Sequence, residues 1–429
     1  MKSFGKIAKY MILFVGTYFL LLGLLVLSAK IPREKIMDKL EESADYMCGK
    51  NLYYKVGNSD TSIIDIYSDS ILLNIAYHFD DEAPLTSVMK AEFYRNTVMD
   101  FANKNLKEAI CDNPAVNAEY LRYWHGSLVI IRPLLTILNV RAMYILNTVV
   151  LICLFLLLMF MLIRRKYIVP AVGFVLASLS VSIWFVSMDF EYIWMFLIML
   201  ACSIISVKFS DKDRAKGFIV LMLIMGMVTN FIDFLTVETL SLSTPLLLTV
   251  WIMYRRNKPS EIRDLVLYSV KACIAWLIGY GGMWTMKWIT AAIVLKKNVL
   301  PYVTGHIEER LVGNFEGNIF LGIFAGLWKN ISSMAPWDYG AFGVVIGILI
   351  VIIIAYYCFV YKVKKPDKNA IVLFALVGLI PYIRYIIMIN HSNMHWFYTY
   401  RAQFVTVLAI VMICAEIIDF VTAFGRLKN

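Results

Sequence analysis

Long runs of apolar residues alternate with short polar segments along most of this 429-residue chain. A run of about 17–25 apolar residues predicts a membrane-spanning helix, because a helix satisfies its own backbone hydrogen bonds in lipid. The pattern predicts ten such spans, at residues 9–29, 141–163, 167–186, 192–208, 216–234, 238–254, 265–285, 340–361, 370–389 and 401–421. We therefore expect an all-α polytopic membrane protein.

Basic residues indicate how these spans are oriented. Lysine and arginine accumulate on the cytoplasmic side of a membrane. The basic segments lie at the start of the first span, at Lys2, Lys6 and Lys9, and after every second span, at 164–166, 208–216, 255–263 and 362–368, and finally at Arg426 and Lys428. This alternation predicts a multi-pass protein of the plasma membrane with both termini in the cytoplasm.

The same orientation leaves two long loops outside the membrane, residues 30–140 and 286–339. The first contains helical periodicity and ends in "GSLVIIRPLLTIL" at 126–138, which is too short to span and predicts an interfacial helix. The second is also partly interfacial. The predicted organisation is a first span at 1–29, an exterior helical loop at 30–140, six spans at 141–285, a second exterior loop at 286–339 and three spans at 340–429.

Composition agrees with a membrane protein and excludes one common class of partner. Hydrophobic residues make up 60% and charged residues 17% of the chain, and the mean hydropathy is +0.69. The net charge of +10 does not indicate a nucleic-acid partner, because no basic stripe with interleaved aromatic residues and no zinc-finger spacing is present. Of the seven cysteines, only Cys48 and Cys111 fall in a polar segment, where a disulfide remains open.

Candidate chemistry gathers on the predicted exterior face. All five histidines fall there: His78, His125, His306, His391 and His395. Polar side chains close to a membrane are costly and are therefore often functional. The motifs of soluble nucleotide-binding and hydrolase sites do not occur, since the chain has no P-loop, no Rossmann fingerprint and no convincing GxSxG triad.

The motif "DIYSDS" supplies two acids in the first exterior loop. Asp65 and Asp69 are four residues apart, so a helix would place them on one face. A carboxylate held beside another carboxylate can have a raised pKa and act as a general base. The alternative is two solvated acids at a helix N-terminus, where the helix dipole stabilises them.

The motif "MDFE" supplies a second pair of acids after the third span. Asp189 and Glu191 are two residues apart, a spacing with which carboxylates can share Mg²⁺ or Mn²⁺ with a diphosphate. Ordinary loop acids are the alternative interpretation.

The stretch "NHSNMHWFYTYR", residues 390–401, separates the last two spans. His391 and His395 have the spacing of a zinc pair, but a third ligand is missing, which argues against zinc. Arg401 lies on the side of the membrane that disfavours arginine, so its guanidinium needs an anion such as a lipid-linked phosphate. Arg122 and His125 of "LRYWHG" and the nearby Arg132 could bind the same anion.

Together, the span layout and these three motifs resemble the C-type glycosyltransferase superfamily of integral membrane enzymes. The segments "YSDSILLNIAY", "RYWHGSLVIIRPLL" and "NHSNMHWFYTYR" also look like a group of uncharacterised Gram-positive membrane proteins of this type. The resemblance implies an inverting transfer of a sugar from a polyprenyl-phosphate donor to a cell-envelope glycan or lipid acceptor on the exterior face. It implies a catalytic carboxylate in the first loop and basic residues in a late loop.

On this interpretation Asp69, in preference to Asp65, is the base, and Arg401, His395 and His391 bind the phosphate. One departure keeps the choice of acid open. In the superfamily the acid usually follows the first span closely, whereas Asp65 lies about 35 residues beyond it.

Two other functions fit the sequence. A flippase or transporter for a lipid-linked saccharide would need broken helices and inverted halves. The charged residues Lys271 and Arg384 within spans agree with it, but the large exterior loop argues against it. A non-catalytic envelope-assembly protein would need no site at all. An assay of sugar transfer separates the three.

Overall fold

The structure is a computed structural model that describes residues 2–57, 59–209, 215–257, 262–311, 318–363 and 365–425. Helices dominate this part of the chain, as the apolar pattern predicts. Parts of the basic segments 208–216, 255–263 and 362–368, together with Arg426 and Lys428, lie outside the described residues, as does the side chain of His306.

Seven helical segments among the described residues are long and apolar enough to cross a membrane. They are α1 (Lys2–Ala29), α7 (Val140–Arg164), α9 (Phe190–Phe209), α12 (Ile262–Leu295), α15 (Gly340–Val360), the pair α16 (Lys368–Gly378) and α17 (Ile380–Ile387), and the run of α19 (Trp396–Thr399), η5 (Tyr400–Gln403) and α20 (Phe404–Ile417). The chain is therefore a helical membrane protein, and the count of ten spans stays a prediction.

The other three predicted spans also form helices, but shorter or less apolar ones: α8 (Ile168–Ser180), α10 (Ala215–Ile232) and α11 (Leu240–Asn257). The first ends early because Ser182 adopts a left-handed conformation (φ 52°) and the 3-10 helix η3 (Ile183–Met188) follows. Thirteen residues of helix are about 20 Å long, less than the roughly 30 Å of a hydrocarbon core. α10 and α11 pack against α12 and α9 inside the bundle.

Residues 30–134 form a compact unit, called here the exterior unit. Its elements are η1 (Arg33–Lys35), α2 (Met37–Cys48), β1 (Tyr53–Lys55), η2 (Asp60–Ser62), β2 (Ile63–Asp65), α3 (Ile66–His78), α4 (Pro84–Lys90), β3 (Glu92–Phe93), α5 (Ala102–Asp112), β4 (Ala118–Glu119) and α6 (Leu128–Leu134). β1 pairs with β2 and β3 with β4, both antiparallel. The sequence analysis missed these strands, because runs of two or three residues show no alternation.

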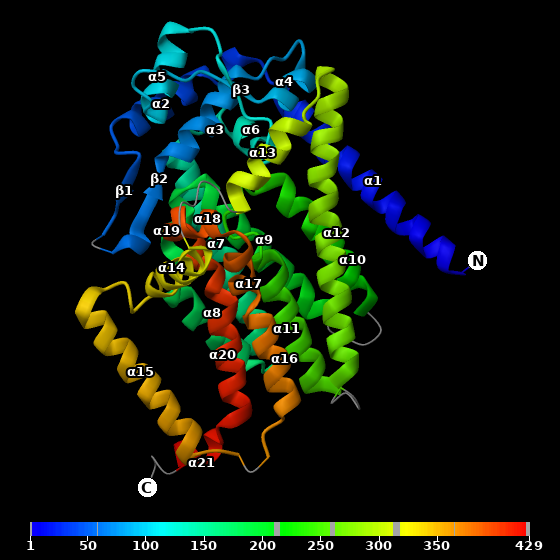
Figure 1. The fold of residues 1–429 in the computed structure, drawn as a ribbon, viewed down its shortest axis with the longest axis vertical. Helices are drawn as coiled ribbons and strands as arrows, with labels where there is room; N and C mark the ends of the chain where they lie inside the picture. Colours follow the sequence, from blue (N-terminus) through cyan, green and yellow to red (C-terminus); the bar gives the residue numbers. More distant parts are fainter. Residues whose placement is uncertain are drawn as a thin grey trace.

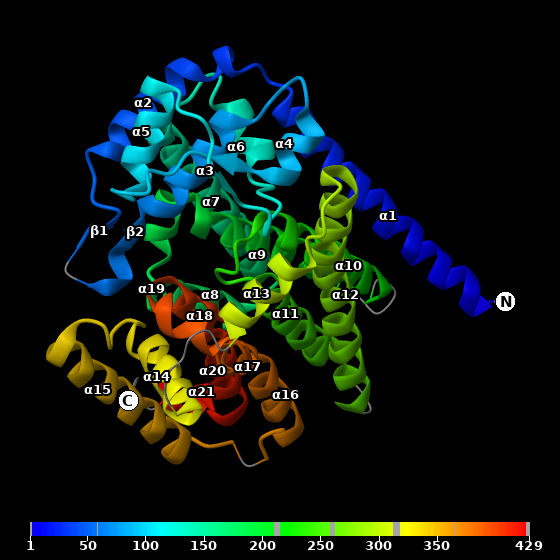
Figure 2. The same cartoon turned by 45° about the horizontal axis from the view of Figure 1, so that its top comes forward.

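The exterior unit lies at one end of the molecule and the C terminus at the other (Figure 1). Four further helices complete the described chain: α13 (Leu300–Leu311), α14 (Ile319–Ser332), α18 (Ile389–Met394) and α21 (Phe420–Gly425). In Figure 1, α13 lies beside the exterior unit and α18 and α19 lie below α3; in the rotated view of Figure 2, all three lie on the side of the exterior unit that faces the C-terminal helices. Elements far apart in the sequence therefore meet at this level.

Helix α12 extends about ten residues beyond the predicted end of its span at residue 285. Its 34 residues are about 51 Å long, so it reaches well past a hydrocarbon core of roughly 30 Å. In the protruding part, the buried ammonium of Lys287 donates to the carbonyl oxygens of Val88 (3.2 Å) and Met89 (3.3 Å). These are carbonyls at the end of α4, so Lys287 joins the exterior unit to α12.

Helix α14 has one apolar exposed face and one buried face. Phe320, Phe324 and Trp328 are largely exposed, whereas Gly326 and Asn330 are buried against the segment that contains α18. An exposed aromatic and aliphatic face of this kind is typical of a helix that lies in the membrane interface. This agrees with the partly interfacial character predicted for the second exterior loop.

The two cysteines of the exterior unit do not form a disulfide. Cys48 and Cys111 are both free thiols, and Cys111 is exposed. The packing of α5 on α2 and α3 therefore holds the exterior unit together without that bridge.

Candidate functional site

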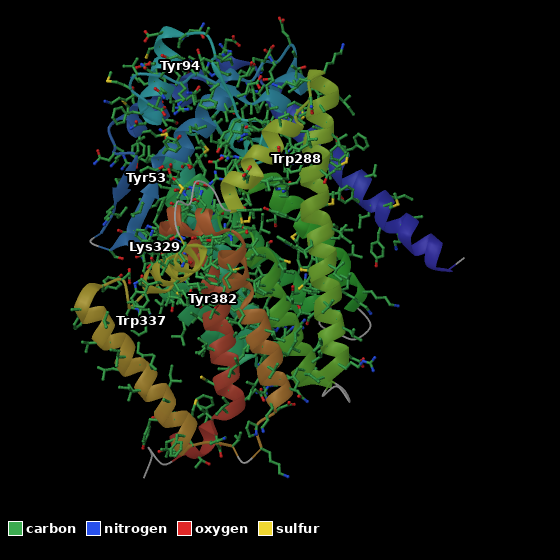
Figure 3. The ribbon with its side chains drawn as sticks, viewed as in Figure 1. Tyr53, Tyr94, Trp288, Lys329, Trp337 and Tyr382 are labelled. Carbon is green, nitrogen blue, oxygen red and sulfur yellow. The ribbon has the colours of Figure 1, made fainter. Side chains whose placement is uncertain are left out.

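A cavity of about 310 Å³ lies where the exterior unit meets α9, α13, α18 and α19. In Figure 3, Tyr53 on its wall lies at the lower edge of the exterior unit, above Lys329 of α14. The lining residues are mostly aromatic or charged: Tyr53, Asp65, Tyr67, Ser68, Ile71, Leu72, Tyr120, Arg122, Tyr123, His125, Glu191, Phe234, Glu309, Arg310, Met394, His395 and Tyr398. Residues from six separate stretches of chain thus meet at one cavity.

Asp65 lines this cavity at the point where β2 ends and α3 begins. It caps α3, because its carboxylate accepts hydrogen bonds from the backbone N–H of Ser68 (2.9 Å) and from the Ser68 hydroxyl (3.2 Å). Burial raises the pKa of the Asp65 carboxyl to about 6. Asp65 is therefore a fixed carboxylate that can exchange a proton near neutral pH.

Asp69 lies one turn further along α3 and does not line the cavity. Its carboxyl accepts from the hydroxyl of Tyr144 (2.5 Å) and from the backbone N–H of Phe190 (3.0 Å). Burial raises the pKa of Asp69 to about 8, so this carboxyl keeps its proton at neutral pH. These contacts favour Asp65 over Asp69 as a base, which reverses the preference from the sequence.

The two acids of "MDFE" have different environments. Asp189 is fully buried behind the cavity wall, where its two oxygens accept from the backbone N–H groups of Asp65 (2.9 Å), Glu191 (2.6 Å) and Tyr192 (3.2 Å). Glu191 lines the cavity, is 7% exposed, and has no hydrogen-bond partner for Oε2 within the described residues. The pair does not point to one metal ion, because Asp189 serves as a helix cap and belongs to no metal-binding cluster among those residues.

Two arginines, Arg122 and Arg310, form another part of the cavity wall. Arg310 of α13 donates from Nη1 to Nε2 of His395 (3.2 Å). Arg122 donates to the hydroxyl of Tyr120 (2.9 Å) and lies 3.7 Å from the Glu309 carboxylate. Arg310 has no signal in the sequence, because "EER" has the pattern of a solvated helix face. Only the folding of α13 over the cavity brings this arginine beside His395.

The hydrogen bonds of His391 and His395 assign the tautomers of their rings. Because arginine only donates, His395 accepts at Nε2 from Arg310 and His391 accepts at Nδ1 from Arg384 (3.2 Å). Both rings are then neutral, and burial lowers the pKa of each, that of His395 to about 3. His391 lies behind the cavity and contacts the hydroxyl of Tyr398 (3.4 Å), which does line it.

His125 contributes an acceptor to the cavity. Its φ of 55° turns the chain sharply, and its Nε2 donates to the carbonyl oxygen of Tyr120 (3.0 Å). Burial lowers the pKa of His125 to about 3, so Nδ1 keeps its lone pair. This atom has no partner in the described chain. Nδ1 of His125 can therefore accept a hydrogen bond from a ligand.

Arg401 does not line the cavity. Its guanidinium donates to the carbonyl oxygens of Thr61 (3.0 Å) and Phe397 (3.2 Å) and lies over the rings of Tyr192 and Tyr400 at 4.7 and 4.9 Å. These contacts compensate the buried charge with carbonyl groups and aromatic faces, although Nε has no partner among the described residues. Because Arg401 does not line the cavity, they favour a structural role. Of the two arginines, only Arg310 lines the cavity, and the phosphate role predicted for Arg401 stays a prediction.

Arg132 is also remote from the cavity. It is fully buried on α6 and donates to the carbonyl oxygens of Ala76 (3.0 Å), Ser28 (2.5 Å), Ala29 (2.7 Å) and Phe79 (3.4 Å). Burial lowers its pKa to about 10, so it stays charged at neutral pH. Arg132 therefore ties the ends of α1 and α3 together and has no donor directed to a ligand in the cavity.

Comparison with protein-family models, curated proteins and solved structures finds no match to this chain. The geometry and chemistry of the cavity are therefore the basis on which a function is inferred.

Proposed function

We propose that this protein is a membrane glycosyltransferase that uses a polyprenyl-phosphate-linked sugar as donor. One observation carries the proposal. Four polar atoms of the cavity wall are buried without a partner among the described residues: Glu191 Oε2, Tyr123 Oη, His125 Nδ1 and Arg310 Nε. Buried polar groups normally form hydrogen bonds, so four such atoms around one cavity indicate a polar ligand.

The identity of these atoms favours a sugar phosphate. Arg122 and Arg310 offer planar guanidinium groups, which bind phosphate oxygens in pairs. Carboxylate, imidazole and phenol groups suit sugar hydroxyls, and the rings of Tyr53 and Tyr67 are stacked with centroids 6.1 Å apart. The cavity thus has groups for both parts of a glycosyl phosphate.

The level of the cavity agrees with a lipid-linked donor. α14, whose exposed face is apolar, packs against α18 next to the cavity. An interfacial helix at this level would place the cavity close to the headgroups, where a polyprenyl phosphate presents its sugar. The tail of the donor would stay in the bilayer among the apolar helices.

Asp65 is the base in the proposed reaction. An acceptor hydroxyl oxygen attacks the anomeric carbon of the sugar as its proton passes to the Asp65 carboxylate. The bond from the anomeric carbon to the phosphate oxygen breaks, and polyprenyl phosphate leaves with the electron pair. This single displacement inverts the anomeric configuration. Arg122 and Arg310 stabilise the charge that develops on the leaving phosphate.

The test is transfer by purified protein in liposomes. The donors are a panel of polyprenyl-phosphate-linked radiolabelled hexoses, and the acceptor is the envelope glycan of the producing cells. We expect label in the acceptor with the wild type and with the control variant Asp81→Asn, an exposed acid of the exterior unit. Asp65→Asn should transfer little. Equal transfer by Asp65→Asn, or none from any donor, contradicts the proposal, and passage of intact donor across the bilayer identifies a flippase.

A further inference from the structure

Two further hollows continue from the cavity along the exterior unit. The first, of about 30 Å³, shares Tyr67 and Ile71 with the cavity, and the second, of about 360 Å³, shares Arg95 and Asp100 with the first. We call the two together the outer groove; the argument below uses its lining residues Tyr67, Phe93, Tyr94, Arg95, Asp100 and Asn105. In Figure 3, Tyr94 lies above Tyr53, so the groove runs from the cavity toward the outer end of the molecule.

The lining of the outer groove has no net charge. Its two charged residues neutralise each other, because Nε of Arg95 donates to the Asp100 carboxylate at 2.8 Å and Nη2 contacts the same oxygen. The remaining lining is aromatic, from Tyr67, Phe93 and Tyr94, or consists of amides and small side chains. An uncharged chain rich in hydroxyl groups fits such a lining, whereas an anionic polymer would need unpaired cations.

Two of the amides are held rigidly. The side chain of Asn74 exchanges two hydrogen bonds with the backbone of Tyr94 (2.9 and 3.2 Å). The side chain of Asn117 does the same with the backbone of Arg95 (2.8 and 2.9 Å). These bonds fix the course of residues 94 and 95 and so hold the groove open in one shape. A preformed site loses less entropy when a flexible chain binds.

Asn105 provides an observation that itself indicates a ligand. It is 3% exposed and lines the first hollow. Its Nδ2 donates to Asp100 (3.2 Å), but its Oδ1 has no partner in the part of the chain that the structure describes. A buried amide oxygen of this kind requires a donor, and the hollow of about 30 Å³ beside it has room for a single hydroxyl group of a sugar that lies across its opening.

We propose that the outer groove binds the acceptor as an uncharged oligosaccharide chain whose terminal hydroxyl enters the cavity beside Asp65. The direction of the chain rests on the proposed glycosyl transfer. The binding itself depends only on the groove. The acceptor is thus a preformed glycan several sugars long, and its sugars stack on Tyr67 and Phe93 and donate to Asn105.

The first experiment measures binding in the absence of donor. The probes are fluorescently labelled neutral oligosaccharides of two to ten sugars, released from the envelope glycans of the producing cells, with the full-length protein in nanodiscs. Affinity for the wild type should increase with chain length. Asn105→Leu and Phe93→Leu should each weaken binding of the longest probe ~10-fold and remove most of the length dependence. Asp112→Asn, an exposed change on the same helix as Asn105, is the control.

Two results overturn the proposal. One is equal binding of the longest oligosaccharide by wild type and by the well-folded Phe93→Leu protein. The other is stronger binding of poly(glycerol phosphate), an anionic polymer of similar length, than of the neutral chains. A loss of folding in Asn105→Leu would leave Phe93→Leu to decide, because that change keeps an apolar side chain at a half-buried position.

A second experiment separates this inference from the proposed function. Asp65→Asn should bind the longest oligosaccharide with the affinity of the wild type while losing transfer. The groove variants should raise the acceptor KM and leave the donor KM unchanged. Oligosaccharide binding without any sugar transfer would contradict the glycosyltransferase and support the groove. Transfer with an unchanged acceptor KM in Phe93→Leu would contradict the groove alone.

Discussion

Buried charged residues occur both in the wall of the cavity and at the contacts that hold the exterior unit to the long helices. We call these contacts the joints; their charged residues are Arg132, Lys287 and Arg401. The two sets differ in what their polar atoms face: the open cavity in one case and backbone carbonyl oxygens in the other.

In the joints, Arg132, Lys287 and Arg401 donate to backbone carbonyl oxygens of other elements and do not line the cavity, although Nε of Arg401 is also buried without a partner among the described residues. In the cavity wall, Glu191 and Arg310 keep buried atoms without a partner among those residues. A buried charge therefore indicates a ligand only when it lines a cavity and its own fold leaves atoms unsatisfied.

Each joint connects segments distant in sequence. Arg132 on α6 bonds the ends of α1 and α3, and Lys287 on α12 bonds the end of α4. Arg401 in η5 bonds Thr61 in η2. The carbonyls at the end of a helix lack intrahelical donors, so a buried cation satisfies them and favours the helix dipole at the same time. The joints therefore hold the exterior unit against the helices that form the rest of the cavity wall.

The largest expected effect is on the cavity carboxylate. Asp65→Asn should reduce transfer ~10²-fold or more, the usual scale for loss of a general base, with donor affinity largely kept. The measurement is kcat for transfer in liposomes together with the thermal midpoint of unfolding. Asp69→Asn, one turn away, is the matched control and should stay active. If Asp69→Asn is dead and Asp65→Asn active, the assignment of the two acids is reversed.

Substitutions in the joints should lower the stability of the protein and leave its transfer activity unchanged. Arg132→Met keeps the length of the side chain but leaves four carbonyl oxygens without their donor. We expect a loss of about 3 kcal/mol in unfolding free energy, since each unsatisfied buried group costs roughly 1–3 kcal/mol. The check is thermal unfolding in detergent beside transfer per folded molecule. If the Arg132→Met protein has normal stability but has lost transfer, Arg132 takes part in substrate binding or catalysis instead.

For Arg310 we expect the opposite result: substitution should change donor binding and leave stability almost unchanged. Arg310→Gln removes a charge and the donor to His395, so the donor KM should rise ~10-fold while the unfolding midpoint hardly changes, as expected for one charge-assisted hydrogen bond. Steady-state kinetics with varied donor concentration test this. Lys329→Gln, on the neighbouring α14, is a control of the same charge change. An unchanged donor KM in Arg310→Gln would remove the phosphate from this part of the cavity.

Arg401 sharpens the comparison, because the sequence favoured it as the phosphate ligand. Arg401→Lys loses the planar group that lies between Tyr192 and Tyr400, so stability should fall by about 1 kcal/mol. Donor affinity of the folded fraction should not change. Binding of a fluorescent polyprenyl phosphate, measured beside thermal unfolding, separates the two effects. A folded variant with weakened binding would restore Arg401 as the ligand.

The smallest effects concern pH. A base works only when deprotonated, and the Asp65 pKa is raised to about 6, so transfer should fall as the pH drops below about 6. For Asp69 the folded pKa of about 8 lies above its ordinary value of 3.8, so the folded state binds the extra proton. Its stabilising contribution is complete below about pH 4 and is lost as the pH rises toward 8.

Thermal unfolding of the wild type and Asp69→Asn across this range tests the second statement. The wild type should lose stability relative to the variant as the pH rises from about 4 to 8. A constant difference between the two proteins would show that Asp69 does not titrate in this range.

The apolar pattern alone determined that this is a helical membrane protein with a large polar unit between its first two long helices. It did so because bilayer thickness translates directly into helix length, and because segments that cross a membrane must be apolar throughout. The same reasoning selected Asp65, Glu191, Arg122, His125 and His395, since polar residues beside long apolar runs are few. Local sequence was sufficient where the physical constraint was local.

Tertiary structure decided which of the selected residues share the cavity. Asp65 and Asp69 have the same residue type and lie on the same helix, but only Asp65 lines the cavity, because Tyr144 and the backbone of Phe190 cover Asp69. Arg310 and the outer groove had no sequence signal. Solvated and buried arginines carry the same charge, and which carbonyls lie within 3 Å of each one depends on the packing of residues hundreds of positions apart.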